Sequence, residues 1–153
     1  MLFLLFRLGK DRYAIDVRQV VEVLPLIAVK RIPQAPPAVS GALNYRGRTV
    51  PLIDLSQLAL GRPAEPRLST RIVMVNYPDG SGQSRLLGLL AEHVTDTMSC
   101  AASDFRDSGV SVPDAPYLGP VATDAQGLVQ WIQIDQLLPG AVRDLLFQTP
   151  VEV

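Results

Sequence analysis

The stretch that decides the fold runs from Arg31 to Leu58 and reads RIPQAPPAVSGALNYRGRTVPLIDLSQL. Three prolines near its start favour a stiff, extended segment, since the proline ring fixes φ and restricts the residue before it. Gly41 permits a close backbone approach or an unusual dihedral angle. Residues 44–48 are then typical of a tight turn between two strands that presents Arg46 and Arg48. From composition alone, an ordinary solvated turn charge is the simplest interpretation of Arg46.

Outward from this hairpin, short aliphatic or β-branched runs recur and are separated by turn residues. We predict further strands at 2–8, 13–17, 27–32, 71–77, 85–90, 117–123 and 128–134. We predict short helices at 54–58, 135–138, 17–24 and within 141–153, the first two with an aspartate as N-cap and the last ending before Pro150. Many short strands with few helices predict a mainly β fold built from barrels or a sandwich.

A weak internal repeat supports two similar units. Residues 49–58 can be laid over 128–137, and residues 14–23 over 88–97, which places Val20 on Val94 and Glu22 on Asp96. Two small β-barrels packed side by side fit this order. We expect one subdomain at about 14–65 and a second at about 71–138, with the first strand and the C-terminal segment as candidates for exchange between them.

Charge and hydropathy exclude several functional classes. The 14 basic and 15 acidic side chains give a net charge of −1, which disfavours nucleic acid as a partner. The longest apolar runs are too short to span a bilayer, so direct membrane insertion is not expected. The apolar start is better interpreted as a first strand than as a signal peptide. A single cysteine, Cys100, excludes an internal disulfide framework, and we expect a cytoplasmic protein.

The inventory of reactive side chains is poor. His93 is the only histidine, and Cys100 has no neighbouring basic residue to activate it. Residues 80–82 are typical of a hairpin tip rather than a phosphate-binding loop. We therefore predict no catalytic residue, no metal and no cofactor. A small hydrolase with a paired carboxylate site remains an alternative, which would draw on Asp16, Asp54, Asp96 and Asp135.

From Ile32 to Leu55 the sequence follows I-P-x-x-P-x-x-V-x-G-A-x-N-x-R-G-x-x-V-P-L-I-D-L and resembles the signature of CheW-like domains. The likeness extends from Phe3 to about Leu138. It implies two five-stranded SH3-like barrels with a few short helices. It also implies a non-catalytic scaffold that couples the cytoplasmic tip of a chemoreceptor (a methyl-accepting chemotaxis protein) to the regulatory domain of a CheA-type histidine kinase, in receptor arrays at the membrane.

The resemblance also implies which positions contact these partners. They are Val20, Glu22, Gly41, Asn44, Arg46, Ile72, Gly88 and Val94. Among them, Glu22 and Arg46 are the polar positions expected to matter most. We expect Val20 and Val94 to line an apolar groove between the barrels that suits an incoming helical hairpin.

The chain departs from the family pattern at two places. Glu92 stands where the family usually has aspartate, followed by His93, and Tyr45 replaces the usual leucine of the N-x-R-G turn. The first departure leaves open a protein that occupies the kinase without coupling receptors. Whether the pathway is flagellar chemotaxis, pilus motility or surface sensing also stays open.

Overall fold

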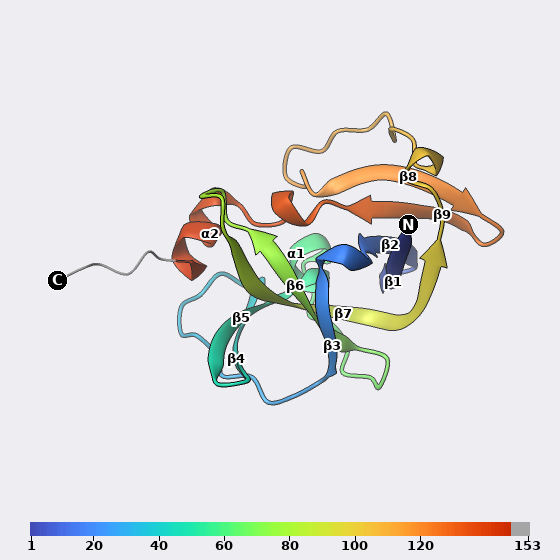
Figure 1. The fold of residues 1–153 in the computed structure, drawn as a ribbon. Helices are drawn as coiled ribbons and strands as arrows, with labels where there is room; N and C mark the ends of the chain where they lie inside the picture. The colour runs from blue at the N-terminus through green and yellow to red at the C-terminus, as the bar shows by residue number, and fades with distance from the viewer. Residues whose placement is uncertain (148–153) are drawn as a thin grey trace.

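The computed structural model describes residues 1–147 and is mainly β (Figure 1). The strands are β1 (Leu2–Leu8), β2 (Asp11–Asp16), β3 (Val20–Pro25), β4 (Val39–Tyr45), β5 (Arg48–Asp54), β6 (Arg71–Pro78), β7 (Ser84–Ser99), β8 (Leu118–Asp124) and β9 (Gly127–Ile132). The chain also forms two short α-helices, α1 (Leu55–Leu60) and α2 (Gly140–Leu146). It has three single-turn 3-10 helices, η1 (Val17–Gln19), η2 (Ala102–Asp104) and η3 (Ile134–Gln136).

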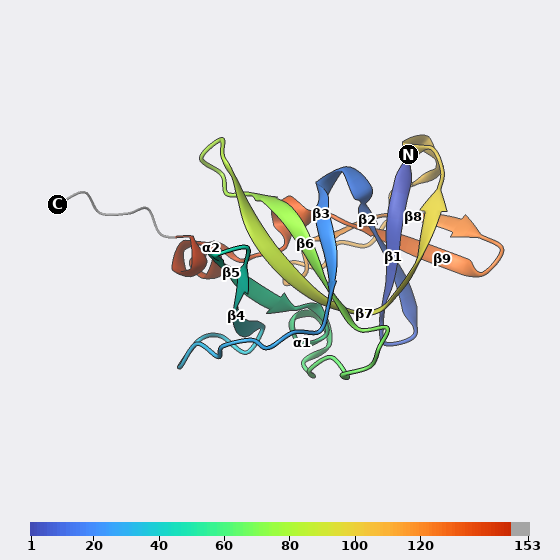
Figure 2. The ribbon, with the colours of Figure 1, turned by 60° about the horizontal axis from the view of Figure 1, so that its bottom comes forward.

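The long strand β7 divides the strands into two sheets of five. We call the "first sheet" the set β3, β6, residues 84–91 of β7, β5 and β4, in spatial order. The "second sheet" is residues 92–99 of β7, then β1, β2, β9 and β8. The two sheets lie side by side in Figure 2, linked through β7. This arrangement confirms the predicted mainly β fold with two SH3-like subdomains.

The internal repeat appears directly in the strand register. Each sheet contains one parallel pair, and there Leu52 of β5 lies opposite Gly88 of β7, while Trp131 of β9 lies opposite Ala14 of β2. The sequence repeat lays Leu52 over Trp131 and Ala14 over Gly88, so the two pairs are equivalent. Both parallel strands are followed at once by a short helix, α1 or η3.

The division of the chain between the sheets differs from the expected bounds of about 14–65 and 71–138. β6 and residues 84–91 of β7 pair with strands of the first half, whereas β1 and β2 pair with strands of the second half. The hairpin β1–β2 of the first repeat therefore joins the sheet that contains β8 and β9. The hairpin β6–β7 of the second repeat joins the sheet that contains β4 and β5. The exchange involves a whole hairpin, rather than the first strand alone.

Three local predictions are wrong. The segment 17–24 forms one 3-10 turn and then strand β3, because its valines alternate between half-buried and exposed positions along β6. The segment 27–32 is no strand and pairs only through one bridge, from Lys30 to Ala42 of β4. At η3, Gln133 is the N-cap and Asp135 makes no capping bond, whereas Asp54 caps α1 as predicted.

The largest core cluster lies between the sheets. It joins Phe6 and Ile15 of the second sheet to Val73 and Leu89 of the first, all at most 1% exposed. Burial of this shared apolar surface fixes one sheet against the other. The C-terminal helix α2 adds to it, and Phe147 stacks on Tyr77 with ring centroids 5.6 Å apart. The predicted helix thus ends before Pro150, which lies outside the described residues.

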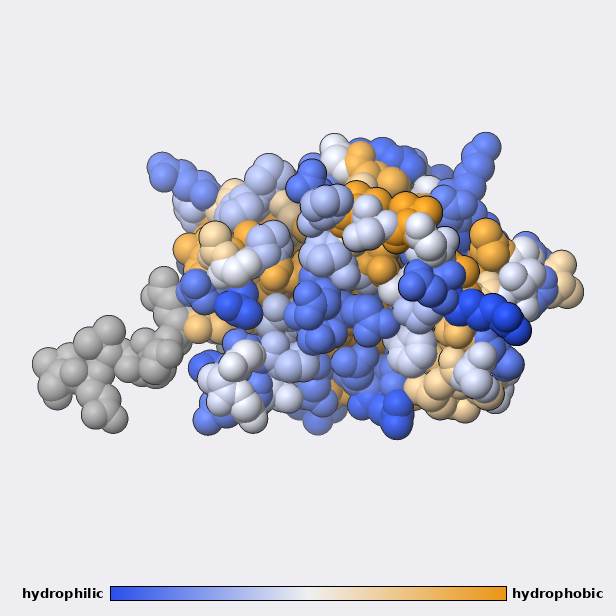
Figure 3. Space-filling model, turned by 90° about the horizontal axis from the view of Figure 1, so that it is seen from above, coloured by the Kyte–Doolittle hydropathy of each residue, from blue (hydrophilic) through white to orange (hydrophobic). Residues whose placement is uncertain are grey.

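Among residues 1–147, no helix is both long and apolar enough to cross a membrane. Seen from above in Figure 3, hydrophilic residues cover most of the face, and hydrophobic residues show in smaller areas between them.

Candidate partner-binding surface

Side chains from β3 and from the β4–β5 hairpin meet at the surface of the first sheet. The hydroxyl of Tyr45, at the end of β4, donates a hydrogen bond of 2.6 Å to Oε2 of Glu22 on β3. Arg46, in the turn between β4 and β5, places its Nη2 3.5 Å from both carboxylate oxygens of Glu22. We call Glu22, Tyr45 and Arg46 the "polar cluster". It joins two of the positions that the sequence predicted and one that it did not.

The geometry of the turn holds Arg46 outward. Its φ of 52° lies in the left-handed region, and Oδ1 of Asn44 accepts a hydrogen bond of 2.9 Å from the backbone N–H of Gly47. The guanidinium lies over the ring of Tyr45, with Cζ 5.2 Å from the centroid, and the side chain is 74% exposed. Asn44 therefore shapes the turn, and the guanidinium of Arg46 is presented to solvent.

Electrostatics make Glu22 the acceptor that organises this cluster. The hydrogen bond to Glu22 is the main cause that raises the pKa of Tyr45 above its usual value, because ionised Tyr45 would face a carboxylate. The ion pair with Arg46 is long and exposed, so it contributes little to stability. The arginine can therefore exchange this contact for one with an incoming carboxylate at small cost.

Gly41 is buried, and its lack of a side chain lets two backbone segments pack closely. A Cβ at this position would lie 2.2 Å from the carbonyl oxygen of Lys30 and 2.8 Å from Cγ1 of Val29. Two backbone hydrogen bonds of 2.8 and 2.9 Å tie Lys30 to Ala42 beside it. Gly41 thus allows the segment after β3 to lie against β4, and its effect on any partner is indirect.

Two further predicted contact positions lie in the core of the first sheet. Ile72 is 0% exposed, and Gly88 is packed so closely that an added Cβ would lie 3.0 Å from Leu52 and 3.3 Å from Ile72. Neither residue can touch a partner from the surface. Ile72 supports β3, because it pairs with Leu24 of that strand.

The expected groove lined by Val20 and Val94 is not formed by these two side chains. Val94 is 2% exposed and belongs to the core cluster between the sheets, and Val20 is half-buried against the same cluster. The sequence repeat aligns Val20 with Val94 because both side chains pack against the core cluster between the sheets. Alternation along each strand turns these two valines inward and turns their neighbours outward.

Glu92 and His93, where the sequence differs from the family pattern, lie at the point where β7 passes from one sheet to the other. His93 has a φ of 53°, and the register with β1 shifts between Arg7 and Leu5 at this point. Oε1 of Glu92 accepts a hydrogen bond of 3.1 Å from the backbone N–H of Glu65 in the linker between α1 and β6. The longer side chain of Glu92 thus fastens the linker.

Of the four carboxylates considered for a hydrolase, Asp16 and Asp54 are engaged in local structure, whereas Asp96 and Asp135 are exposed and, within residues 1–147, bond only to the neighbouring Thr95 and Gln136. Asp16 binds the guanidinium and backbone N–H of Arg18, and Asp54 accepts from three backbone N–H groups. The hollow of about 460 Å³ beside η2 and β8 is lined by Asp104 and Asp124, which cap a turn and pair with Arg12 respectively. In the described part of the chain, no group of three or more potential metal ligands converges.

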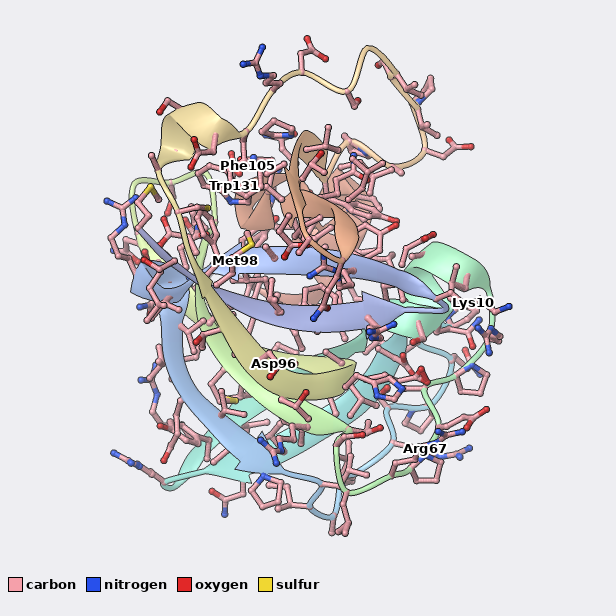
Figure 4. The ribbon with its side chains drawn as sticks, turned by 90° about the vertical axis from the view of Figure 1, so that its right-hand side faces the viewer. Lys10, Arg67, Asp96, Met98, Phe105 and Trp131 are labelled. Atoms are coloured by element: carbon pink, nitrogen blue, oxygen red, sulfur yellow. The ribbon has the colours of Figure 1, made fainter. Side chains whose placement is uncertain are left out.

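The second sheet carries a separate aromatic cluster. Phe105 packs with its ring centroid 5.1 Å from Trp131 of β9 and 5.0 Å from Phe3 of β1. Figure 4 shows Phe105, Trp131 and Met98 near one another, with Asp96 further along β7, Lys10 at the turn between β1 and β2, and Arg67 in the linker before β6. This cluster fixes the long segment between β7 and β8.

Sequence reasoning missed Tyr45 and the outward-facing Val21 and Val23 of β3. Val21 and Val23 are 43% and 36% exposed. The period-two alternation of residues 20–25 was the signal for them, but the same residues also fit one helical face. Tyr45 falls on a variable position of the N-x-R-G motif, and only its bond to Glu22 reveals its role.

Comparison with known proteins agrees with this fold. The CheW-like domain model matches residues 2–142. The chain is 33% identical over 104 residues to chemotaxis protein CheW of Klebsiella aerogenes, covering 68% of this chain and 60% of that protein. It is 24% identical over 142 residues to chemotaxis protein CheW of Rhizobium meliloti, covering 91% and 88%. The crystal structure of scaffolding protein TtCheW from Thermoanaerobacter tengcongensis superposes with a TM-score of 0.77 at 22% identity, covering 91% and 89%. The chain belongs to the family of CheW-like domains.

Proposed function

We propose that this chain is a non-catalytic scaffold of chemotaxis signalling that couples a chemoreceptor to a CheA-type histidine kinase. In this proposal the kinase contributes its regulatory domain and the receptor its cytoplasmic tip. The adaptor acts in the cytoplasm, at membrane-associated receptor arrays. Its output is geometric, because holding both partners lets receptor movement alter kinase activity.

The observation that carries the proposal is the polar cluster on the first sheet. Glu22 and Arg46 are the polar positions that the family resemblance assigns to partner contacts, and they lie within 3.5 Å of each other at the surface. Arg46 is 74% exposed, whereas two of the four carboxylates considered for a hydrolase are already engaged, Asp54 as a helix cap and Asp16 by Arg18. An exposed arginine beside carboxylates that are already bonded fits a protein-binding surface better than a catalytic site.

Affinity measurements with the purified regulatory domain of the cognate kinase and with a receptor cytoplasmic fragment test the proposal. Arg46→Glu places a second carboxylate beside Glu22 and should weaken at least one of the two interactions about tenfold or more. Arg62→Glu is the matched control, because Arg62 is exposed in the linker between α1 and β6.

Circular dichroism spectra and urea midpoints of both variants should match those of the wild type. Binding of neither partner by the wild-type protein would contradict the scaffold proposal. Unchanged binding of both partners by Arg46→Glu would contradict the role of Arg46 alone. Binding of the kinase without the receptor would identify a protein that occupies the kinase without coupling.

A further inference from the structure

The helix α2 lies outside the repeat that builds the two sheets. The repeat lays residues 49–58 over 128–137, so α1 corresponds to η3, and α2 follows once both sheets are complete. Figure 1 shows α2 at one end of the molecule, beside the hairpin of β6 and β7. Asp54 caps α1 through two backbone N–H groups, whereas Pro139, the N-cap of α2, provides no side-chain hydrogen bond. The two short helices are therefore fastened differently.

Side-chain packing holds α2 in place. Its apolar side chains, together with Phe147 stacked on Tyr77, lie against the core cluster between the sheets, yet no residue of the helix is itself buried. The guanidinium of Arg143 lies beside Gly80 at the tip of the β6–β7 hairpin, but its ion pair is with Asp144 of the same helix. A helix of seven residues is not stable by itself in water, so α2 depends on this packing.

The docked helix covers a hydroxyl that has no partner. Tyr77 is 0% exposed, and within residues 1–147 its hydroxyl forms no hydrogen bond. Desolvation raises the pKa of Tyr77, and the charge of Arg143 and the approach of the backbone of Leu138 offset only part of this rise. The phenol oxygen thus lies near the start of α2. Covering it destabilises the docked state, because the same hydroxyl is hydrogen-bonded to water when the helix is away.

We infer that α2 is a reversible cap, which detaches from the β6–β7 hairpin as a unit while both sheets stay folded. Detachment admits water to the hydroxyl of Tyr77 and uncovers the apolar side chains beneath the helix. Such a local opening needs less free energy than global unfolding, because it breaks few buried contacts. A ligand that binds one of the two states shifts the balance between them, which makes the cap a switch built into the fold.

Native-state hydrogen exchange of the full chain, followed by NMR at increasing urea concentrations below the unfolding transition, tests the cap. The amides of Arg143 and Phe147, each bonded within the helix, should exchange about a hundredfold or more faster than that of Val73 in β6, with a weaker dependence on urea. Tyr77→Phe keeps the stack, removes the unpartnered hydroxyl and should slow the exchange of α2 about fivefold. Tyr13→Phe is the matched control, because Tyr13 also stacks on a phenylalanine but lies in the second sheet, and it should act within about twofold.

A second pair of variants changes the packing. Phe147→Ala removes the stack and should speed the exchange of α2 about tenfold, whereas Leu145→Ala, at a position 49% exposed on the same helix, should act within about twofold. Exchange of α2 as slow as that of Val73, with the same dependence on urea, would overturn the inference, because the helix would then open only when the whole protein unfolds. Fast exchange that neither Tyr77→Phe nor Phe147→Ala changes would also overturn it, because fraying of the helix ends would then account for the exchange.

Discussion

Gly41→Ala should destabilise the protein strongly, although Gly41 belongs to the motif that the resemblance links to partner contacts. The added Cβ would lie 2.2 Å from the carbonyl oxygen of Lys30, far inside van der Waals contact. The backbone atoms of Lys30 would have to move by about 1 Å to reach ordinary contact distance. This movement separates Lys30 from Ala42 and breaks the two hydrogen bonds that join them.

Two contributions give the magnitude. An alanine at the φ of 147° costs about 1 to 2 kcal/mol in backbone strain. Each of the two hydrogen bonds contributes about 1 kcal/mol net. The free energy of unfolding should therefore fall by about 3 to 4 kcal/mol, a large share of the roughly 5 to 15 kcal/mol typical of a domain.

Gly127→Ala is the matched control. Gly127 also has a positive φ, of 114°, but nothing lies within 4 Å of its added Cβ, so it should lose about 1 to 2 kcal/mol. Both substitutions restrict the unfolded chain equally, so that effect cancels in the comparison. Urea denaturation, followed by circular dichroism, should separate the two midpoints by about 1 M. Equal midpoints would refute the conclusion that Gly41 is needed for close backbone packing against Lys30. A Gly41→Ala variant that binds the kinase poorly at wild-type stability would refute it too.

Three further substitutions test the packing, capping and charge that hold the two sheets. Asp54→Ala removes the acceptor of the N–H groups of Ser56, Gln57 and Ala64 and should cost about 1 to 2 kcal/mol in urea denaturation; a loss below about 0.3 kcal/mol would contradict its role as cap. Phe105→Ala should cost about 3 kcal/mol and shift the emission of Trp131, the only tryptophan, to longer wavelength, whereas an unchanged spectrum would place Phe105 away from that ring. Hydrogen bonds from the side chain and backbone of Ser81, and then one from Arg85, lower the pKa of Asp79 to about 2. The contribution of ionised Asp79 to stability is therefore complete above its ordinary pKa of 3.8 and is lost as the pH falls toward 2. Ser81→Ala should move the pKa of Asp79 toward 3.8 in an NMR titration; a value still near 2 would show that the hydroxyl contributes little.

Local sequence signals predicted the features that depend on near neighbours. Asp54 before a short apolar run predicted the cap of α1, and residues 80–82 predicted the β6–β7 turn. The mainly β fold followed from the number of short strands and from the repeat. The failure at 17–24 has a physical reason, since four of the five apolar residues in this segment fit one face of a helix, and a short apolar run of this kind also fits a strand. Pairing with β6, about fifty residues away, decides in favour of the strand.

Long-range pairing also explains why some of the predicted site residues are buried. Burial of Ile72, Gly88 and Val94 depends on which strand lies opposite each one, and a motif contains no such information. The exchange of hairpins between the repeats is invisible for the same reason. Glu22 and Arg46 could be named from the family resemblance, whereas their contact with each other and the bond from Tyr45 required the fold.

The measurement that tests the central claim most directly is reconstitution of the three proposed components. Vesicles carrying the cognate chemoreceptor are mixed with the CheA-type kinase, with and without this chain, and are then sedimented. Autophosphorylation of the kinase is followed in the same samples. We predict that the kinase sediments with the vesicles, and responds to receptor ligand, only when the chain is present. A kinase that sediments and responds equally well without the chain, or that remains in solution with it, would contradict the claim that this protein couples receptor to kinase.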